Sequence, residues 1–250
     1  MPEKNRIYRA RIEGYTSEGL GVARIDGQAV FVHRALRGED CDVLILKVLK
    51  NAAFGKAVRV YVPSPHRVEP DCPYYGRCGG CDFRHMDRAE ELDAKRQRVQ
   101  DALRRIGGSA VTVEGIDSGA PLHYRNKSQY PAAADGSVGF YKARSHQVIP
   151  VETCLIQKPQ ADAAARALRT YIASCGVSCY DERTRRGLVR HLYVRTNGAG
   201  QSLICVVVNG KKLPQEEKLV DLLRQAVPEA VGVVLGVNTQ PTGAVLGSEY

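Results

Sequence analysis

The stretch GLGVARIDGQAVFVH, residues 19–33, sets two runs of alternating apolar and polar residues on either side of an Asp26-Gly27 turn. A period of two is typical of a strand with one buried face, and glycine readily adopts the backbone conformation of a hairpin turn. Five short strands in about sixty residues favour a small closed barrel of the OB type, because closure removes exposed sheet edges. We therefore predict such a barrel over residues 1–63. The same alternation recurs in residues 7–15, 39–50 and 55–62.

The charge balance of the chain indicates its partners. Its 250 residues include 36 Lys+Arg and 27 Asp+Glu, which gives a net charge of +9. This excess favours a polyanion, most commonly nucleic acid. The composition, 44% hydrophobic and 25% charged, is that of a globular protein and excludes collagen and wholesale disorder. We find no apolar run of the roughly 18 residues that a membrane span needs and no secretory signal. The sequence thus predicts a cytoplasmic protein without a membrane partner.

The remaining chain divides into three predicted parts. Residues 64–83 form a proline-rich linker with a cluster of cysteines, and residues 84–108 form an amphipathic helix that two glycines end. Residues 109–250 alternate paired strand patterns with two helices, which favours an α+β domain with an antiparallel sheet. These two helices, expected over 159–173 and 214–226, both open with proline.

The string CPYYGRCGGC, residues 72–81, contains Cys72, Cys78 and Cys81, and Cys154 is the natural fourth member of the group. In a chain without a secretory signal, clustered cysteines indicate metal binding or catalysis. Three close cysteines and one remote are common for iron–sulfur sites, whereas four-cysteine zinc sites usually have two paired knuckles. The pattern favours an iron–sulfur cluster, and a zinc site or metal-free thiols are the alternatives. Among the other cysteines, Cys41 and Cys205 lie in strand patterns and are expected to be small buried side chains, whereas Cys175 and Cys179 follow a helix.

The motifs together resemble the bacterial 23S rRNA (uracil-5-)-methyltransferases, within the RNA 5-methyluridine methyltransferase family. Residues 19–24 are similar to its RNA-binding TRAM domain, and CPYYGRCGGC with Cys154 is similar to its 4Fe–4S motif. Shorter similarities follow in the same order along the chain, at residues 123–127, 139–142, 190–192 and 236–242.

The resemblance implies methylation of uracil C5 in ribosomal RNA with S-adenosylmethionine as the methyl donor. In that family a cysteine thiolate adds to uracil C6, the activated C5 takes the methyl group, and a base removes the C5 proton. The target base must leave its stack to be reached. We assign no catalytic residue and no S-adenosylmethionine-binding residue to this chain.

We also find no glycine-rich strand–loop–helix of the kind that holds a nucleoside cofactor. We therefore predict that the Rossmann-like methyltransferase domain is absent from this chain, that the chain is truncated before it, and that the chain alone is inactive. The resemblance then leaves RNA recognition and the 4Fe–4S cluster to this chain, which we expect to be a monomer.

Several side chains are candidate RNA contacts. Arg125 and Lys127 are two apart, so in a strand they share one face and can meet adjacent phosphates. Phe140 with Lys142 places an aromatic ring beside a cation, as base-stacking surfaces do. Residues 183–195 hold five arginines and no acid, which indicates phosphate binding by Arg185, Arg186 and Arg190.

Three alternatives remain open. One is a stand-alone iron–sulfur protein that binds RNA, and another is the same methylation on transfer RNA. The third is a radical methylthiotransferase, but its motif spaces cysteines three and two residues apart, unlike the spacing of five and two here.

Overall fold

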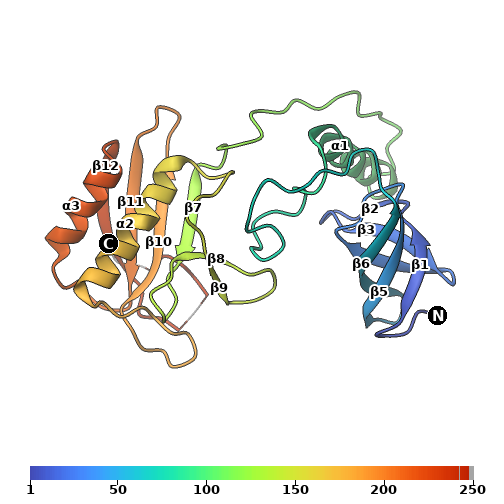
Figure 1. Ribbon diagram of the computed structural model, residues 1–250. Coiled ribbons are helices and arrows are strands. Elements are labelled where there is room, and N and C mark those ends of the chain that lie inside the picture. The colour runs from blue at the N-terminus through green and yellow to red at the C-terminus, as the bar shows by residue number, and fades with distance from the viewer. Residues whose placement is uncertain (242, 248–250) are drawn as a thin grey trace. The chain divides into compact units, whose positions relative to one another are not determined.

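The computed structural model describes residues 1–241 and 243–247 (Figure 1). The chain forms two compact units that are interleaved in sequence. Unit 1 comprises Met1–Pro73 and Cys81–Ser118, and unit 2 comprises Tyr74–Gly80 and Gly119–Tyr250. The cysteine-containing segment predicted as a linker is therefore divided between the two units.

Unit 1 is built on a six-stranded sheet in the order β1-β5-β6-β4-β3-β2. Strands β1 and β2 lie at opposite ends of this order but are separated in the chain by only Ile12 and Glu13, so the sheet must curl until its edges meet. This matches the predicted barrel. The strands are β1 (Ile7–Arg11), β2 (Gly14–Tyr15), β3 (Gly21–Ile25), β4 (Gln28–His33), β5 (Asp40–Val48) and β6 (Ala52–Val62).

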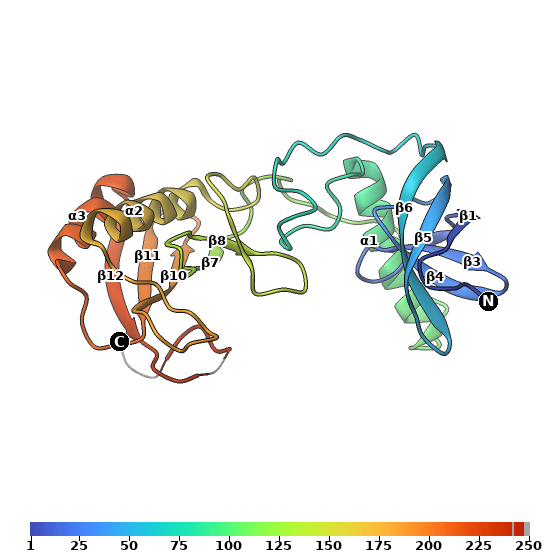
Figure 2. The same ribbon diagram turned by 60° about the horizontal axis from the view of Figure 1, so that its bottom comes forward.

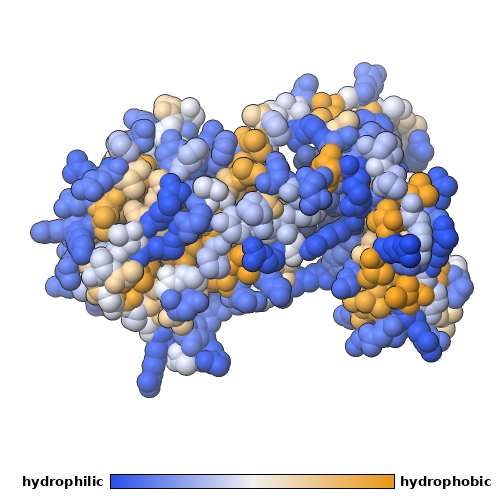
Figure 3. All heavy atoms as spheres, viewed as in Figure 1, coloured by the Kyte–Doolittle hydropathy of each residue, from blue (hydrophilic) through white to orange (hydrophobic). Residues whose placement is uncertain are grey.

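The hairpin between β3 and β4 confirms the predicted turn. Ile25 pairs with Gln28, and the two residues between them have positive φ, 49° at Asp26 and 77° at Gly27. Inward-facing aliphatic side chains fill the barrel, among them Val30, Val32, Val43 and Ile45. Apolar side chains are also exposed on its surface, as Figure 3 shows, and those on β1, β5 and β6 include Ile7, Leu46, Val48 and Val58.

Helix α1 (Arg88–Arg105) completes unit 1. It begins four residues later than predicted because Asp87 is its N-cap, with a carboxylate that accepts from the Glu90 backbone N–H at 2.9 Å. Three contacts hold it against the barrel: the Tyr15 hydroxyl donates to Glu90 at 2.7 Å, and Arg37 pairs with both Glu90 and Asp93.

Unit 2 consists of a four-stranded sheet in the order β12-β11-β10-β7, a small β8–β9 hairpin and two helices. Helices α2 and α3 cover one face of the sheet in both views (Figures 1 and 2). Its elements are β7 (Lys127–Pro131), β8 (Gly139–Tyr141), β9 (Val148–Pro150), α2 (Pro159–Cys175), β10 (Val189–Thr196), β11 (Ser202–Val208), α3 (Glu216–Ala226) and β12 (Ala230–Val237).

The prediction of an antiparallel sheet in this unit is wrong, because the sheet is mixed. Strands β7, β10 and β11 pair antiparallel, but β11 and β12 pair parallel. The reason is α3, which carries the chain back along the sheet between β11 and β12, so that both strands run in the same direction.

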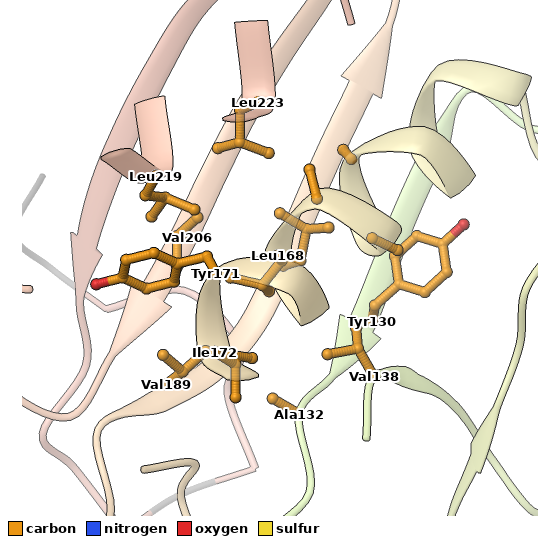
Figure 4. Close-up of a cluster of buried hydrophobic side chains, with 14 of the residues drawn as sticks. Tyr130, Ala132, Val138, Leu168, Tyr171, Ile172, Val189, Val206, Leu219 and Leu223 are labelled. Carbon is orange, nitrogen blue, oxygen red and sulfur yellow. The ribbon is translucent and has the colours of Figure 1, made fainter. Parts of the chain in front are cut away.

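The core of unit 2 lies between the two helices and the sheet (Figure 4). Leu168 and Tyr171 of α2 and Leu223 of α3 are fully buried there, against Leu192 and Val206 of the sheet. Within residues 1–241 and 243–247, no helix is both long and apolar enough to cross a membrane.

Candidate nucleic-acid interface and cysteine pairs

Residues 181–186 of unit 2 form a tight turn that exposes three arginines. The Asp181 backbone N–H donates to the Arg186 carbonyl at 2.8 Å, and the Arg185 N–H donates to the Asp181 carbonyl at 2.7 Å. The Asp181 carboxylate accepts from the Arg183 N–H at 2.8 Å. These bonds fix the backbone of the turn, while the side chains of Arg183, Arg185 and Arg186 extend into solvent.

Glu182 joins this turn to the loop of the β8–β9 hairpin. Its Oε2 lies 2.5 Å from His146 Nδ1, and its Oε1 accepts from the Tyr141 hydroxyl at 3.3 Å. Burial, reinforced by the Glu182 charge, raises the pKa of Tyr141 to about 12, so the hydroxyl keeps the proton that it donates. The hairpin loop carries exposed Lys142 and Arg144.

Two basic loops thus share one carboxylate, and we call this surface the Glu182 clamp. The clamp includes three of the predicted RNA contacts: Lys142 lies in the hairpin loop, and Arg185 and Arg186 lie in the turn, which is remote from Lys142 in sequence. It consists of Tyr141, Lys142, Arg144, His146, Glu182, Arg183, Arg185 and Arg186.

Two predicted RNA contacts, Phe140 and Arg190, make contacts within the fold. The Phe140 and Tyr130 ring centroids are 4.5 Å apart, and Phe140 packs against the unit 2 core. Arg190 is only 4% exposed, and its Nη1 donates to the carbonyls of Asn238 and Gln240 at 2.6 and 2.8 Å. Their contact with RNA stays a prediction, and neither the packing of Phe140 on the core nor the burial of Arg190 favours it.

Arg125 and Lys127 lie in another part of unit 2 and do not share a strand. The Arg125 backbone N–H donates to the Ile156 carbonyl at 2.9 Å, ahead of β7. Lys127 is the first residue of β7 and is paired across the sheet with Arg195. Both predicted contacts are exposed, but the cation that faces Lys127 is Arg195 rather than Arg125.

Cys78 and Cys154 belong to unit 2. Cys78 Sγ accepts from the Gly80 backbone N–H at 3.4 Å. The Cys154 N–H donates to Asp162 Oδ2 at 2.7 Å, and the other oxygen of this buried carboxylate accepts from the Tyr130 hydroxyl at 2.7 Å. Burial raises the pKa of the Cys154 thiol. Both sulfurs therefore lie on backbone that is fixed by hydrogen bonds.

The segment that carries Cys78 packs closely on β8. The Gly79 N–H donates to the Tyr141 carbonyl at 2.9 Å, and a Cβ at Gly79 would lie 2.9 Å from Ala143 Cα. The backbone can come this close only because residue 79 has no side chain.

Cys72 and Cys81 belong to unit 1, where both influence Arg84. The Arg84 Nε donates to Asp71 Oδ1 at 2.8 Å. This bond is the main cause of the raised pKa of Arg84, and the charges of Cys81 and Cys72 add to it. Both thiols are partly exposed.

The donor set has the chemistry of an iron–sulfur site. Cysteine thiolates are the usual ligands, hydrogen bonds to sulfur tune such clusters, and a nearby cation offsets their negative charge. In unit 2, the sulfur of Cys78 accepts the Gly80 hydrogen bond, and in unit 1, Cys72 and Cys81 lie near the Arg84 cation. Among the described residues, however, the structure brings no three His, Cys, Asp or Glu side chains together as a metal-binding group.

Three other cysteines are buried, and burial raises the pKa of each: to about 11 for Cys41 and Cys179, and upward for Cys205. Neutral, buried thiols behave as small apolar side chains.

Sequence reasoning missed Glu182 and Asp162. Glu182 immediately precedes the arginine-rich segment, and that position is the only signal that could have marked it. Asp162 lies among alanines in the first turn of α2, where a carboxylate is more often a favourable helix-end charge. Its contact with Cys154 is visible only in three dimensions.

Comparison with known proteins finds similarity along almost the whole chain. Residues 3–58 match the family model of the TRAM domain. The chain is 41% identical to an uncharacterized RNA methyltransferase of Clostridium tetani and 38% identical to one of Caldanaerobacter subterraneus. The matches cover 99% and 97% of this chain, and it spans about half the length of these curated relatives, 55% of each.

The fold is shared with a solved structure, the tRNA (uracil-54, C5)-methyltransferase of Pyrococcus abyssi in complex with S-adenosyl-L-homocysteine. The TM-score is 0.71 at 18% identity, over 96% of this chain and 54% of the other. The prediction that the chain is truncated before an absent Rossmann-like domain is therefore wrong: 99% of the chain aligns with the RNA methyltransferase of Clostridium tetani, and 96% of it shares the fold of the solved methyltransferase.

Proposed function

We propose that this chain recognises RNA for an S-adenosylmethionine-dependent methyltransferase that modifies uracil C5, and that its substrate is a uridine of 23S rRNA. The identity with RNA methyltransferases over almost the whole chain and the TRAM match at residues 3–58 support an RNA substrate. We further propose that the protein acts in the cytoplasm as a monomer. S-adenosylmethionine would supply the methyl group.

The Glu182 clamp is the observation that carries this proposal. Its two loops present Lys142, Arg144 and three arginines, while its shared carboxylate accepts hydrogen bonds from both loops. Flexible surface cations lose side-chain entropy when they bind phosphate. Because the backbone of these loops is already fixed by hydrogen bonds, binding costs less additional conformational entropy. The clamp therefore suits the phosphate backbone of a structured RNA.

Binding measured across a range of salt concentrations tests the proposal. The probes are a 23S rRNA fragment and a transfer RNA of similar length, and the variant is Arg185→Ala/Arg186→Ala. Because each phosphate contact adds about 0.7–0.9 to the salt slope, we expect the slope to fall by about 1.5 and the affinity to drop.

The matched control is Lys211→Ala/Lys212→Ala, which removes two exposed cations of unit 2 elsewhere. Equal effects of the two double variants would overturn the role of the clamp. Methylation of transfer RNA but not of 23S rRNA by the protein would overturn the rRNA substrate in favour of the second candidate, which the fold of the archaeal enzyme supports. RNA binding without methyl transfer to either would support the stand-alone binding protein.

We propose that Cys72, Cys78, Cys81 and Cys154 bind one 4Fe–4S cluster. The thiol donor set, the Gly80 hydrogen bond to Cys78 and the cation at Arg84 support this assignment. With four cysteine ligands such a cluster has no open iron, so its role would be to order the protein around it. Anaerobic purification should give a brown protein with about four irons. One zinc and no colour would contradict the assignment.

A further inference from the structure

The sheet of unit 2 has one face without a helix. Helices α2 and α3 lie on the other face (Figures 1 and 2), where alternate residues of β10 and β11 such as Leu192, Val194 and Ile204 enter the core. Successive side chains of a strand point to opposite faces, so the residues between them face away from the helices. The strand register aligns these residues in rows across the sheet.

Two rows give this face its chemistry. The first consists of Lys127, Arg195, Leu203 and Gly232, and the second of Gln129, Tyr193, Cys205 and Val234. The two rows contain no acidic residue. We call these eight residues the open sheet face.

Lys127 and Arg195 are direct partners on neighbouring antiparallel strands, and both are exposed. Like charges directly opposite one another destabilise a strand pair. An anion bound between the two side chains would relieve this repulsion, so the pair is better suited to a phosphate than to the unliganded sheet.

Tyr193 is half-buried and lies one position along β10 from the buried Val194, so its ring is on the open sheet face. Its hydroxyl accepts from Arg195 Nη1 at 3.4 Å. The cross-strand neighbours of Tyr193 are Cys205, which is only 6% exposed, and Gln129, and neither is aromatic or charged. An aromatic ring beside cations on a helix-free four-stranded sheet is the arrangement that stacks bases in single-stranded RNA recognition.

The next row closes one end of this surface. It consists of Pro131, His191, Val207 and Gly236, all buried. His191 is 9% exposed, and its Nδ1 has no hydrogen-bond partner among the described residues. The open sheet face is thus bounded by a buried row that retains an unused polar atom.

We propose that the open sheet face binds single-stranded RNA, with a base stacked on Tyr193 and a phosphate held between Lys127 and Arg195. This inference rests on the proposed function, because it assumes that the chain binds RNA. It adds a surface that reads unpaired nucleotides, whereas the Glu182 clamp meets the backbone of a folded RNA.

The experiment compares a twelve-nucleotide single-stranded oligouridine with a duplex RNA of the same length. Because one stacked base contributes a factor of about 5 to 160 in affinity, we expect Tyr193→Leu to weaken oligouridine binding by that factor and to leave duplex binding unchanged. Tyr193→Phe keeps the ring and should bind like the wild type. The control Tyr124→Leu removes a tyrosine elsewhere in unit 2, which is 55% exposed, and should have no effect.

A second variant, Lys127→Gln/Arg195→Gln, changes only exposed side chains and so tests the proposal even if Tyr193→Leu is poorly folded. It should reduce the salt slope for oligouridine by about 1. Unchanged binding by both variants, with wild-type binding intact, would overturn the open sheet face alone. Failure of the wild type to bind any RNA, including the 23S fragment, would overturn the proposed function itself.

Discussion

Glu39 and Arg67 form an ion pair inside unit 1, with Arg67 Nη2 2.7 Å from Glu39 Oε2. The carboxylate is fully buried and also accepts from the backbone N–H groups of Leu36 and Ser64, at 2.8 and 3.2 Å. Burial alone would raise the pKa of Glu39, but the hydrogen bonds from Arg67 and the two amides outweigh it, so the pKa lies below its ordinary value. The Glu39 side chain thus holds Ser64 and Arg67, which follow β6, against the barrel.

We expect Glu39→Gln to lower the free energy of unfolding by about 3 kcal/mol at pH 7, because it leaves the Arg67 charge without its partner. The folded-state pKa is lowered, so the contribution of the pair is complete above the ordinary value of 4.5 and is lost as the pH falls through the folded-state pKa. The difference between wild type and variant should therefore shrink in acid. Denaturant unfolding at pH 7 and at lower pH measures it, and exposed Glu18→Gln is the control.

Glu182→Ala should loosen both loops of the Glu182 clamp. The variant removes the acceptor for Tyr141 and His146, so the backbone amides of residues 142–147 and 181–186 should exchange with solvent faster. Hydrogen exchange followed by mass spectrometry measures this, with Glu217→Ala on α3 as a matched loss of one exposed carboxylate. Equal protection in the two variants would show that Glu182 does not hold the loops together.

Gly79→Ala should displace the segment that carries Cys78. The new methyl group would lie 2.9 Å from Ala143 Cα, which is backbone and cannot move aside cheaply. Overpacking of this kind costs about 1–3 kcal/mol. The midpoint temperature of thermal unfolding and the iron content should both fall. The control Gly198→Ala, with no atom within 4 Å of the added carbon, should change neither.

Asp162→Ala should release the loop of Cys154. The N–H of Cys154 and the buried Tyr130 hydroxyl would both lose their acceptor, at a cost of about 3 kcal/mol in unfolding free energy. We expect lower iron content as well, because Cys154 would no longer be held in place. Tyr130→Phe should have a smaller effect, and Asp221→Ala, an exposed change on α3, should have almost none. Wild-type stability and iron content in Asp162→Ala would contradict this positioning role.

Local patterns in the sequence predicted much of the fold. The Asp26-Gly27 turn needs positive φ at two successive residues, and an Asp-Gly pair is typical of such a turn. Helix α2 runs to Cys175, beyond the predicted end at residue 173, and stops at Gly176, whose φ of 62° favours glycine. The direction of β12 was not predictable in this way, because the run AVGVVLGV is equally apolar read in either direction and only the path of α3 decides it.

The candidate sites were harder to predict because they depend on pairs that are remote in sequence. His146 and Glu182 are 36 residues apart, and nothing in either neighbourhood identifies the other. Composition predicted phosphate binding by the arginine-rich segment, in which Arg185 and Arg186 are exposed, but the same reasoning included Arg190, which lies at a register shift of β10 and is buried. Spacing along a strand predicts which residues share a face only when the strand boundaries are known, and Arg125 lies outside β7.

Residues 74–80 belong to unit 2, although the chain on both sides of them belongs to unit 1. Neither unit is therefore a contiguous piece of sequence that could be excised, transplanted or exchanged by recombination as a module. A protease that nicks the backbone between residues 109 and 122, where there is no helix or strand, would leave an N-terminal fragment that still holds seven residues of unit 2. The hydrogen bond from the Gly79 N–H to the Tyr141 carbonyl of β8 would then join two separate fragments.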